Sequence, residues 1–131
     1  MNGNKAVLDS NFLIFVSKGL IDREKLRSAY DNLYVSIVTY IEVYAYHFVD
    51  ETQKQSIDKV FDYLEIIEIN FDVADQTIIY RKNKTKKIKL PDAAILATAK
   101  ITNADLITDN HRDFQDIDSS VNVLDLDQFK V

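Results

Sequence analysis

The chain of 131 residues contains no cysteine, one proline, two glycines and no long hydrophobic run. The absence of cysteine excludes disulfide bonds, thiolate zinc sites and a cysteine nucleophile. A membrane-spanning helix needs about 20 apolar residues, and no run approaches that length. The segment Met1–Lys5 lacks a charged region followed by an apolar stretch, so we expect no signal peptide. Together these absences favour a cytoplasmic protein with no membrane association.

Hydrophobic residues make up 47% of the chain. A chain of this length can bury a core without covalent or metal crosslinks. No repeat, linker or low-complexity segment interrupts it. We therefore expect a single domain over residues 1–131.

The formal net charge is −5, from 16 basic and 21 acidic residues. This overall acidity argues against binding to nucleic acid, because RNA and DNA are polyanions. The basic residues are unevenly distributed, however, and six of them form one strip: Arg81, Lys82, Lys84, Lys86, Lys87 and Lys89. The remainder of the chain has 10 basic against 21 acidic residues, a charge of −11. The strip is therefore either an RNA contact or a charged, solvated loop.

Short apolar segments alternate with segments of helical periodicity along the chain. The predicted strands are Ala6–Leu8, Leu33–Ser36, Leu64–Ile69, Leu106–Thr108 and Val121–Leu124. The predicted helices are Asn11–Val16, Asp22–Ser28, Val38–Val49, Thr52–Asp62, Phe71–Lys84 and Pro91–Ile101. Gly19 marks the end of the first helix, and Pro91 suits the first turn of the last. The alternation predicts an α/β fold, with a central parallel sheet of about five strands flanked by helices on both faces.

Two acidic residues directly follow predicted strands. Asp9 comes after Ala6–Leu8, and Asp109 comes after Leu106–Thr108. In open parallel sheets, ligands bind beyond the carboxyl ends of the strands. Each residue alone also has a simpler interpretation, because aspartate at such a position often begins a turn or caps a helix.

Two further acids lie on helices that we expect to face the core. The apolar positions of the Val38–Val49 helix are Val38, Ile41, Ala45 and Val49. Glu42 falls within this stripe, where an unpaired carboxylate would cost several kcal/mol. Asp92 lies in the first turn of a helix whose following residues are small and apolar on nearly every face. If the four acids converge, their repulsion requires a cation, and an all-oxygen ligand set suits Mg²⁺ or Mn²⁺.

Four segments resemble, in order and spacing, the signature of the PIN domain family, and in particular its VapC-type toxin ribonucleases. They are Val7–Ile14, Glu42, Leu90–Ala99 and Leu106–Phe114. The similarity extends from Ala6 to about Leu124. It implies a three-layer PIN-like fold and a metal-dependent ribonuclease, in which metal-activated water attacks the RNA phosphate in line.

The same resemblance implies roles for individual residues. Asp9, Glu42, Asp92 and a more variable fourth position would bind the metal and carry catalysis. We assign the fourth position to Asp109, with Asn110 as the alternative. The residues expected to orient these carboxylates are Ser10, Asn11, Thr108 and Asn110, and Asp113 would contact the metal through water. The basic strip that leads into Asp92 would guide the RNA backbone.

Proteins of this type usually form homodimers and are silenced by a small antitoxin that occupies the active-site groove. The resemblance therefore implies an RNA substrate, a homodimer and a cognate antitoxin. Two alternatives stay open. One is a catalytically weak PIN domain that binds RNA or protein, and the other is a housekeeping RNA-processing nuclease. The sequence indicates neither the RNA target nor whether one or two ions bind.

Overall fold

The computed structural model describes residues 4–131, so the expected absence of a signal peptide concerns a segment partly outside them. Within these residues the chain forms five strands and seven α-helices, followed by a 3-10 turn, η1 (Leu126–Phe129). The strands are β1 (Lys5–Leu8), β2 (Asn32–Ser36), β3 (Glu65–Ile67), β4 (Asp105–Thr108) and β5 (Val123–Asp125). The helices are α1 (Ser10–Ser17), α2 (Arg23–Ala29), α3 (Ile37–Ala45), α4 (Glu51–Phe61), α5 (Phe71–Arg81), α6 (Leu90–Thr102) and α7 (His111–Phe114).

The strands form one sheet in the order β3-β2-β1-β4-β5, and every neighbouring pair is parallel. The chain winds from β1 to β2 and β3 in one direction, then returns to the other side of β1 with β4 and β5. The winding therefore reverses between β1 and β4, and such a switch point opens a crevice at the carboxyl ends of the two strands. The predicted parallel sheet of about five strands is confirmed.

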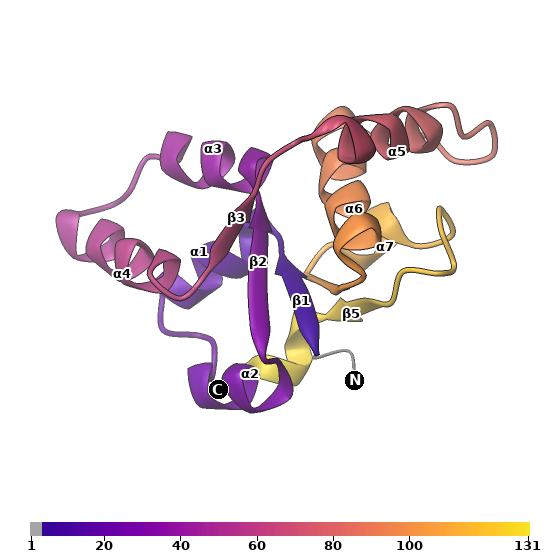
Figure 1. Ribbon diagram of the computed structural model, residues 1–131. Coiled ribbons are helices and arrows are strands. Elements are labelled where there is room, and N and C mark those ends of the chain that lie inside the picture. The colour runs from indigo at the N-terminus through magenta and orange to yellow at the C-terminus, as the bar shows by residue number, and fades with distance from the viewer. Residues whose placement is uncertain (1–3) are drawn as a thin grey trace.

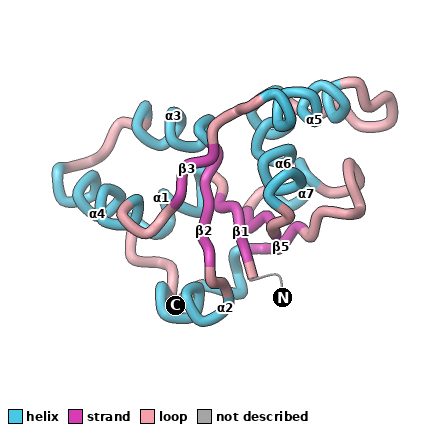
Figure 2. Tube along the Cα trace, in the orientation of Figure 1, coloured by secondary structure: helices cyan, strands magenta, loops and turns pink. Residues whose placement is uncertain are grey.

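Alternate residues of the strands face opposite sides of the sheet, as the pleat requires. Ala6 and Leu8 belong to one core cluster, with residues of α1 to α4, whereas Val7 belongs to a second, with residues of α5 to α7. Figure 1 shows α1, α3 and α4 on one side of the sheet and α5, α6 and α7 on the other. Figure 2 shows the strands as one twisted band between these helices. The predicted α/β fold with three layers is thus present.

Short polar residues begin five of the helices by accepting a backbone N–H through the side chain. These residues are Asp9, Asp22, Ser36, Asp50 and Asn70, for α1 to α5 respectively. Gly19 follows the end of α1 with φ 73°, a left-handed conformation that glycine adopts without strain. Across residues 4–131, no helix combines the length and apolarity needed to cross a membrane.

The predicted helix Val38–Val49 is too long. α3 ends at Ala45, and Tyr46 leaves the helix with an extended backbone at ψ 140°. His47 and Val49 therefore lie outside the helix, and the Val49 side chain is 83% exposed. The segment after Ala45 is rich in aromatic side chains, which lose rotational freedom in a helix.

Three other elements are shorter than predicted. β3 stops at Ile67 because this residue pairs with Ser36, the last residue of β2 before α3 begins. β5 begins at Val123 rather than at residue 121. α5 ends at Arg81 because the Asn83 side chain accepts two backbone N–H groups and turns the chain. The four-residue α7 and η1 were not predicted, since such short helices leave no periodicity to detect.

Candidate active site

Asp9 lies at the carboxyl end of β1, at the switch point of the sheet. Its side chain is buried, with 5% of its surface exposed. One carboxylate oxygen accepts the Phe12 N–H at 2.9 Å and so caps α1, while the other accepts the Thr108 hydroxyl at the end of β4. Asp9 is thus both the helix cap of the simpler interpretation and a charged group fixed in the crevice.

The surroundings of Asp9 oppose its ionisation. Burial is the main cause that raises the pKa of Asp9 to about 6, and the carboxylates of Asp109 and Asp92 raise it further. The hydrogen bonds from Thr108 and Phe12 act in the opposite direction without cancelling the effect. Within residues 4–131, no lysine or arginine forms an ion pair with Asp9, so its negative charge lacks a compensating cation.

Thr108 links Asp9 to the segment that follows β4. The Thr108 side chain is fully buried, and its hydroxyl donates to Asp9 and accepts the Asn110 backbone N–H at 2.9 Å. One side chain therefore sets both the orientation of Asp9 and the path of the chain through Asp109.

Glu42 does not lie on the buried face of its helix, contrary to the prediction. α3 buries Thr39 and Val43, whereas Ile41 is 60% exposed and Glu42 is exposed as well. The orientation of α3 where it follows β2 at Ser36 sets which of its residues face the core. The apolar stripe of the sequence does not. Glu42 nevertheless reaches the switch point, because its Oε1 accepts the hydroxyl of Ser10 at 2.6 Å.

Asp92 is the third residue of α6 and is partly buried. Desolvation is the first cause that raises its pKa, followed by the charges of Asp113 and Glu42, while Lys89 lowers it. Every residue from Ala93 to Ala99 is buried, which holds α6 firmly against the sheet. Asp92 is therefore carried by the most deeply buried helix of the described chain.

Asp109 and Asn110 are both exposed but face different partners. Asp109 raises the pKa of Asp9 by its charge and borders the hollows on both sides of the switch point. The Asn110 amide donates instead to the Asp113 carboxylate, within the turn that begins α7. Of the two residues, Asp109 is therefore the one whose charge acts on Asp9.

A groove of about 450 Å³ runs between α1 and α3. It is lined by Ser10, Asn11, Ile14, Phe15, Lys18, Glu42, Val43, Tyr46 and Asp109. Ile14, Phe15 and Lys18 were not predicted from the sequence as site residues. The spacing of Ile14 and Lys18 could have indicated that they line the groove, because they follow Ser10 at intervals of four residues and so share its helix face.

The donor set of this site suits a hard divalent cation. The four acids offer only oxygen ligands, and the burial of Asp9 leaves a charge that a cation would neutralise. Their present spacing does not enclose an ion, since no three histidine or acidic side chains of the described residues lie close enough to bind one together. The chemistry therefore fits Mg²⁺ or Mn²⁺, and binding would require the exposed side chains to move inward.

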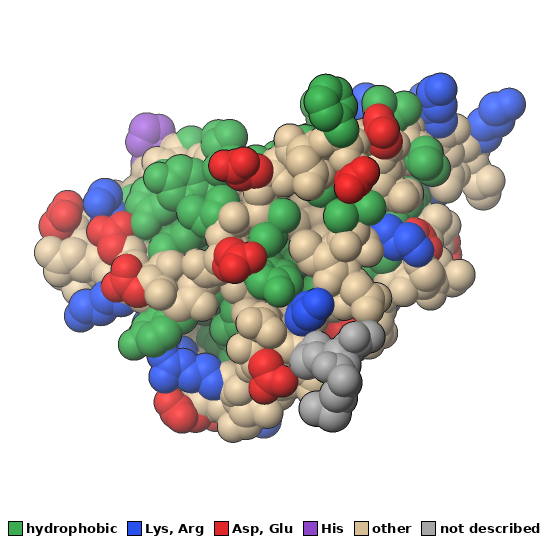
Figure 3. Space-filling view, in the orientation of Figure 1, with side chains coloured by type: hydrophobic (Ala, Val, Ile, Leu, Met, Phe, Trp, Pro, Cys, Tyr) green, Lys and Arg blue, Asp and Glu red, His purple; other side chains and the backbone are tan. Residues whose placement is uncertain are grey.

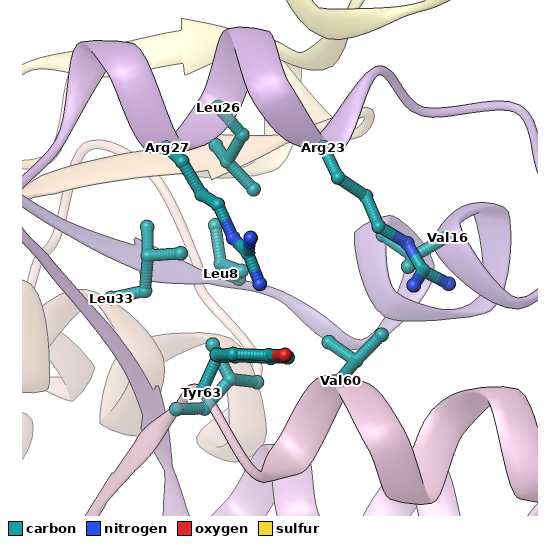
Figure 4. A pocket seen from close by; sticks show the side chains of 9 residues that line it. Leu8, Val16, Arg23, Leu26, Arg27, Leu33, Val60 and Tyr63 are labelled. Carbon is teal, nitrogen blue, oxygen red and sulfur yellow. The ribbon is translucent and has the colours of Figure 1, made fainter.

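A second, apolar pocket lies between α2 and the end of α4, and none of the four acids lines it. The Arg27 guanidinium lies over the Tyr63 ring, 4.1 Å from the ring centroid. In Figure 4 the Arg23 side chain lies instead on the side of the pocket formed by Val60 and Val16. The cavity measures about 30 Å³, which is about the volume of one water molecule. It is too small to be a substrate site.

Comparison with known proteins agrees with this fold. The PIN domain family pattern matches residues 6–120. A toxin–antitoxin complex from Klebsiella pneumoniae contains a chain 33% identical to this one, with a TM-score of 0.65, covering 88% of this chain and 94% of that one.

Two more distant structures share the fold. DNA-bound VapBC2 from Rickettsia felis is 20% identical with a TM-score of 0.79, covering 92% of this chain and 98% of that one. A chain of DNA-bound VapBC from Salmonella typhimurium is 21% identical with a TM-score of 0.77, covering 94% of this chain and 98% of that one. No curated protein matches the chain. The family match, which spans most of the sequence, shows that the chain belongs to the PIN domain family.

Proposed function

We propose that this PIN domain is a ribonuclease that hydrolyses RNA phosphodiester bonds with Mg²⁺ or Mn²⁺, and that it is the toxin of a toxin–antitoxin pair. PIN domains are nucleases, which supports hydrolysis in general. One observation carries the proposal most directly. Asp9 is buried at the switch point with a pKa of about 6, next to two other acids and without a basic partner. Stability alone does not explain why a protein keeps such a charge there.

In this proposal, Asp9, Glu42, Asp92 and Asp109 hold the metal. A bound divalent cation would supply a water of lowered pKa and neutralise charge on the reacting phosphate. Thr108 and Ser10 keep the Asp9 and Glu42 carboxylates oriented through their hydroxyl groups. Asn11 and Asp113 lie at the edge of the site, where Asn11 lines the groove and Asp113 faces Asp92.

The groove between α1 and α3 is the proposed binding site for the antitoxin. It combines the apolar side chains of Ile14, Phe15 and Val43 with the acids Glu42 and Asp109. A partner segment with apolar residues and one basic side chain would complement this lining and block the acids. The toxin–antitoxin complex from K. pneumoniae, 33% identical to this chain, supports a partner of this kind.

A separate apolar groove of about 430 Å³ supports the proposed homodimer. It lies between α3, α5 and α6 and is lined by Val38, Ile69, Ala74, Thr77, Ile78, Leu90, Pro91 and Ala94. Exposed apolar residues extend it, since Phe71 is 86% exposed and Ile79 61%. Figure 3 shows hydrophobic side chains exposed over the region of α5. A second copy would remove this surface from water, and a Leu90→Asp variant should sediment as a monomer.

The test is cleavage of a panel of structured RNAs in EDTA, Mg²⁺ or Mn²⁺ by the wild-type chain and by Asp9→Asn and Glu42→Gln variants. We expect cleavage that requires metal and is lost in both variants. Cleavage that persists in EDTA or in both variants would contradict the proposed site. Thermal unfolding with and without Mn²⁺ provides an independent readout, because a stabilising shift that needs Asp9 reports metal binding without cleavage.

One observation favours the alternative of a domain that only binds RNA or protein. In residues 4–131, the acids are not close enough as they stand to enclose an ion. If Mn²⁺ produces no thermal shift and no RNA is cut, this alternative replaces the ribonuclease. An antitoxin gene beside the gene for this chain would separate a toxin from an RNA-processing enzyme.

A further inference from the structure

The basic strip is held in one conformation by two of its own cations. It comprises the end of α5 and the segment 82–89 that joins α5 to α6. Arg81 donates from Nη1 to the Ile88 carbonyl at 2.6 Å, and Ile88 is buried. Lys86 donates from Nζ to the carbonyl oxygens of Arg112 and, at 2.8 Å, of Gln115. Hydrogen bonds therefore join the two ends of the strip to each other and its middle to the α7 segment.

This fastening places part of the strip beside the acidic site. Lys86, Lys87 and Lys89 line a hollow of about 140 Å³ together with Ile88 and two carboxylates, Asp92 and Asp113. Asp92 is one of the four acids proposed to bind metal. A phosphate that approaches Asp92 through this hollow would pass the side chains of Lys87 and Lys89.

The other two lysines of the strip lie elsewhere. Lys82 caps the end of α5, and Lys84 lies within the turn that the Asn83 side chain closes. Both are exposed, and neither lines the hollow. Figure 3 shows basic side chains projecting into solvent beyond the end of α5. The six cations of the strip therefore fall into three pairs with different surroundings.

We propose that the strip is divided in function, and that Lys87 and Lys89 each contact an RNA phosphate next to the phosphodiester bond that is cleaved near Asp92. Arg81 and Lys86 are positioning residues that hold the segment, and Lys82 and Lys84 add only long-range attraction. The proposal rests on the proposed ribonuclease function. Its physical basis is the need to bring a polyanion to a cluster of carboxylates, where two nearby ammonium groups offset the repulsion and fix the register of the strand.

Two double variants of equal charge test the division: Lys87→Gln/Lys89→Gln and Lys82→Gln/Lys84→Gln. Binding of a fluorescein-labelled single-stranded RNA of mixed sequence is measured by anisotropy in EDTA, over a range of salt concentrations. We expect the first pair to weaken binding by more than about tenfold and the second by less than about threefold. For the first pair the salt slope should fall by about 1.4, the value for two lost phosphate contacts.

Lys86 is tested by a pair of single variants. Lys86→Met removes the donors to α7 and should weaken RNA binding, whereas Lys86→Arg keeps donors and charge and should restore it. The folded state of each variant is verified by thermal unfolding. In cleavage assays, the Lys87→Gln/Lys89→Gln variant should raise KM with little change in kcat.

The outcomes separate this inference from the proposed function. Equal weakening by the two double variants, or weakening by neither, overturns the division while leaving cleavage by the wild-type chain as evidence for the nuclease. Binding that depends on Lys87 and Lys89 in a protein that cuts no RNA with either metal supports the division and overturns the nuclease. No RNA binding by the wild-type chain overturns the division outright.

Discussion

The two sides of the candidate active site are built differently. On one side Asp9 is buried, caps α1 and accepts the Thr108 hydroxyl, all within the central strands of the sheet. On the other side Glu42 is exposed on the nine-residue helix α3 and accepts one hydrogen bond, from Ser10. The core therefore fixes the position of the Asp9 carboxylate, whereas the Glu42 side chain is free to change its conformation. This difference explains how acids that do not yet enclose an ion would close around one.

The largest expected effect tests this contrast through side-chain length. Asp9→Glu adds a methylene to a packed position and should lower cleavage by more than about 100-fold. Glu42→Asp shortens an exposed side chain whose helix can shift, and should lower cleavage by only about tenfold. Metal-dependent cleavage rates measure both. Equal losses in the two variants would mean that both sides of the site are equally rigid.

The next effect concerns the stability of the metal-free protein. The pKa of Asp9 is raised to about 6 from an ordinary value of 3.8, so the folded state keeps this proton at pH values where the unfolded chain has released it. The contribution of Asp9 to stability should therefore be lost as pH rises from about 4 to 6, by up to about 3 kcal/mol. Chemical unfolding in EDTA at pH 4.5 and 7.5, with Asp9→Asn as the reference, isolates this contribution.

Adding Mn²⁺ at pH 7.5 should restore wild-type stability and leave Asp9→Asn nearly unchanged. Asparagine keeps an oxygen that can accept the Phe12 N–H, so the variant should still fold. If the metal-free wild-type chain is as stable as Asp9→Asn at pH 7.5, the burial of Asp9 has no energetic cost and the reason for a cation disappears.

A smaller effect is expected at the hydroxyl that supports Asp9. Thr108→Val keeps the shape of the side chain but leaves the Asp9 carboxylate and the Asn110 N–H without this partner. We expect a loss of about 1–3 kcal/mol in unfolding free energy and a 10- to 100-fold loss of cleavage, both on the order of known effects. Urea unfolding and initial cleavage rates provide the two measurements. Thr108→Ser, which retains the hydroxyl, is the matched control and should remain close to wild type.

The smallest effect is expected on the exposed side. Ser10→Ala removes the hydrogen bond to Glu42 in a partly solvated position, so stability should change by less than about 1 kcal/mol. Cleavage should fall severalfold, because Glu42 then loses the only side-chain hydrogen bond that it makes within residues 4–131. A stability loss as large as that of Thr108→Val would show that the Glu42 side belongs to the rigid part of the site.

The contrast also explains which parts of the structure could be predicted. The strand before Asp9, the helix-capping interpretation of Asp9 and the parallel sheet all follow from local signals in the sequence. The order of the strands does not, because it depends on contacts between segments far apart in the chain. The burial face of α3 does not, because Ile41 and Glu42 are turned outward by the way β2 leads into the helix at Ser36. Nor could the hydrogen bonds from Lys86 to the α7 segment be predicted. They reach backbone carbonyls 26 and 29 residues away, and no pattern of side chains in the sequence indicates such partners.

The hydrogen bond between Thr108 and Asp9 joins residues that are 99 positions apart. β1 is synthesised well before β4, so its pairing with β4 must wait until residues 105–108 have left the ribosome. Contacts of such long sequence separation form late in folding. A nascent or truncated chain without β4 would leave Asp9 without the Thr108 hydroxyl, at the end of an incomplete sheet. Any activity that depends on this crevice would therefore begin only once translation of the domain is nearly complete.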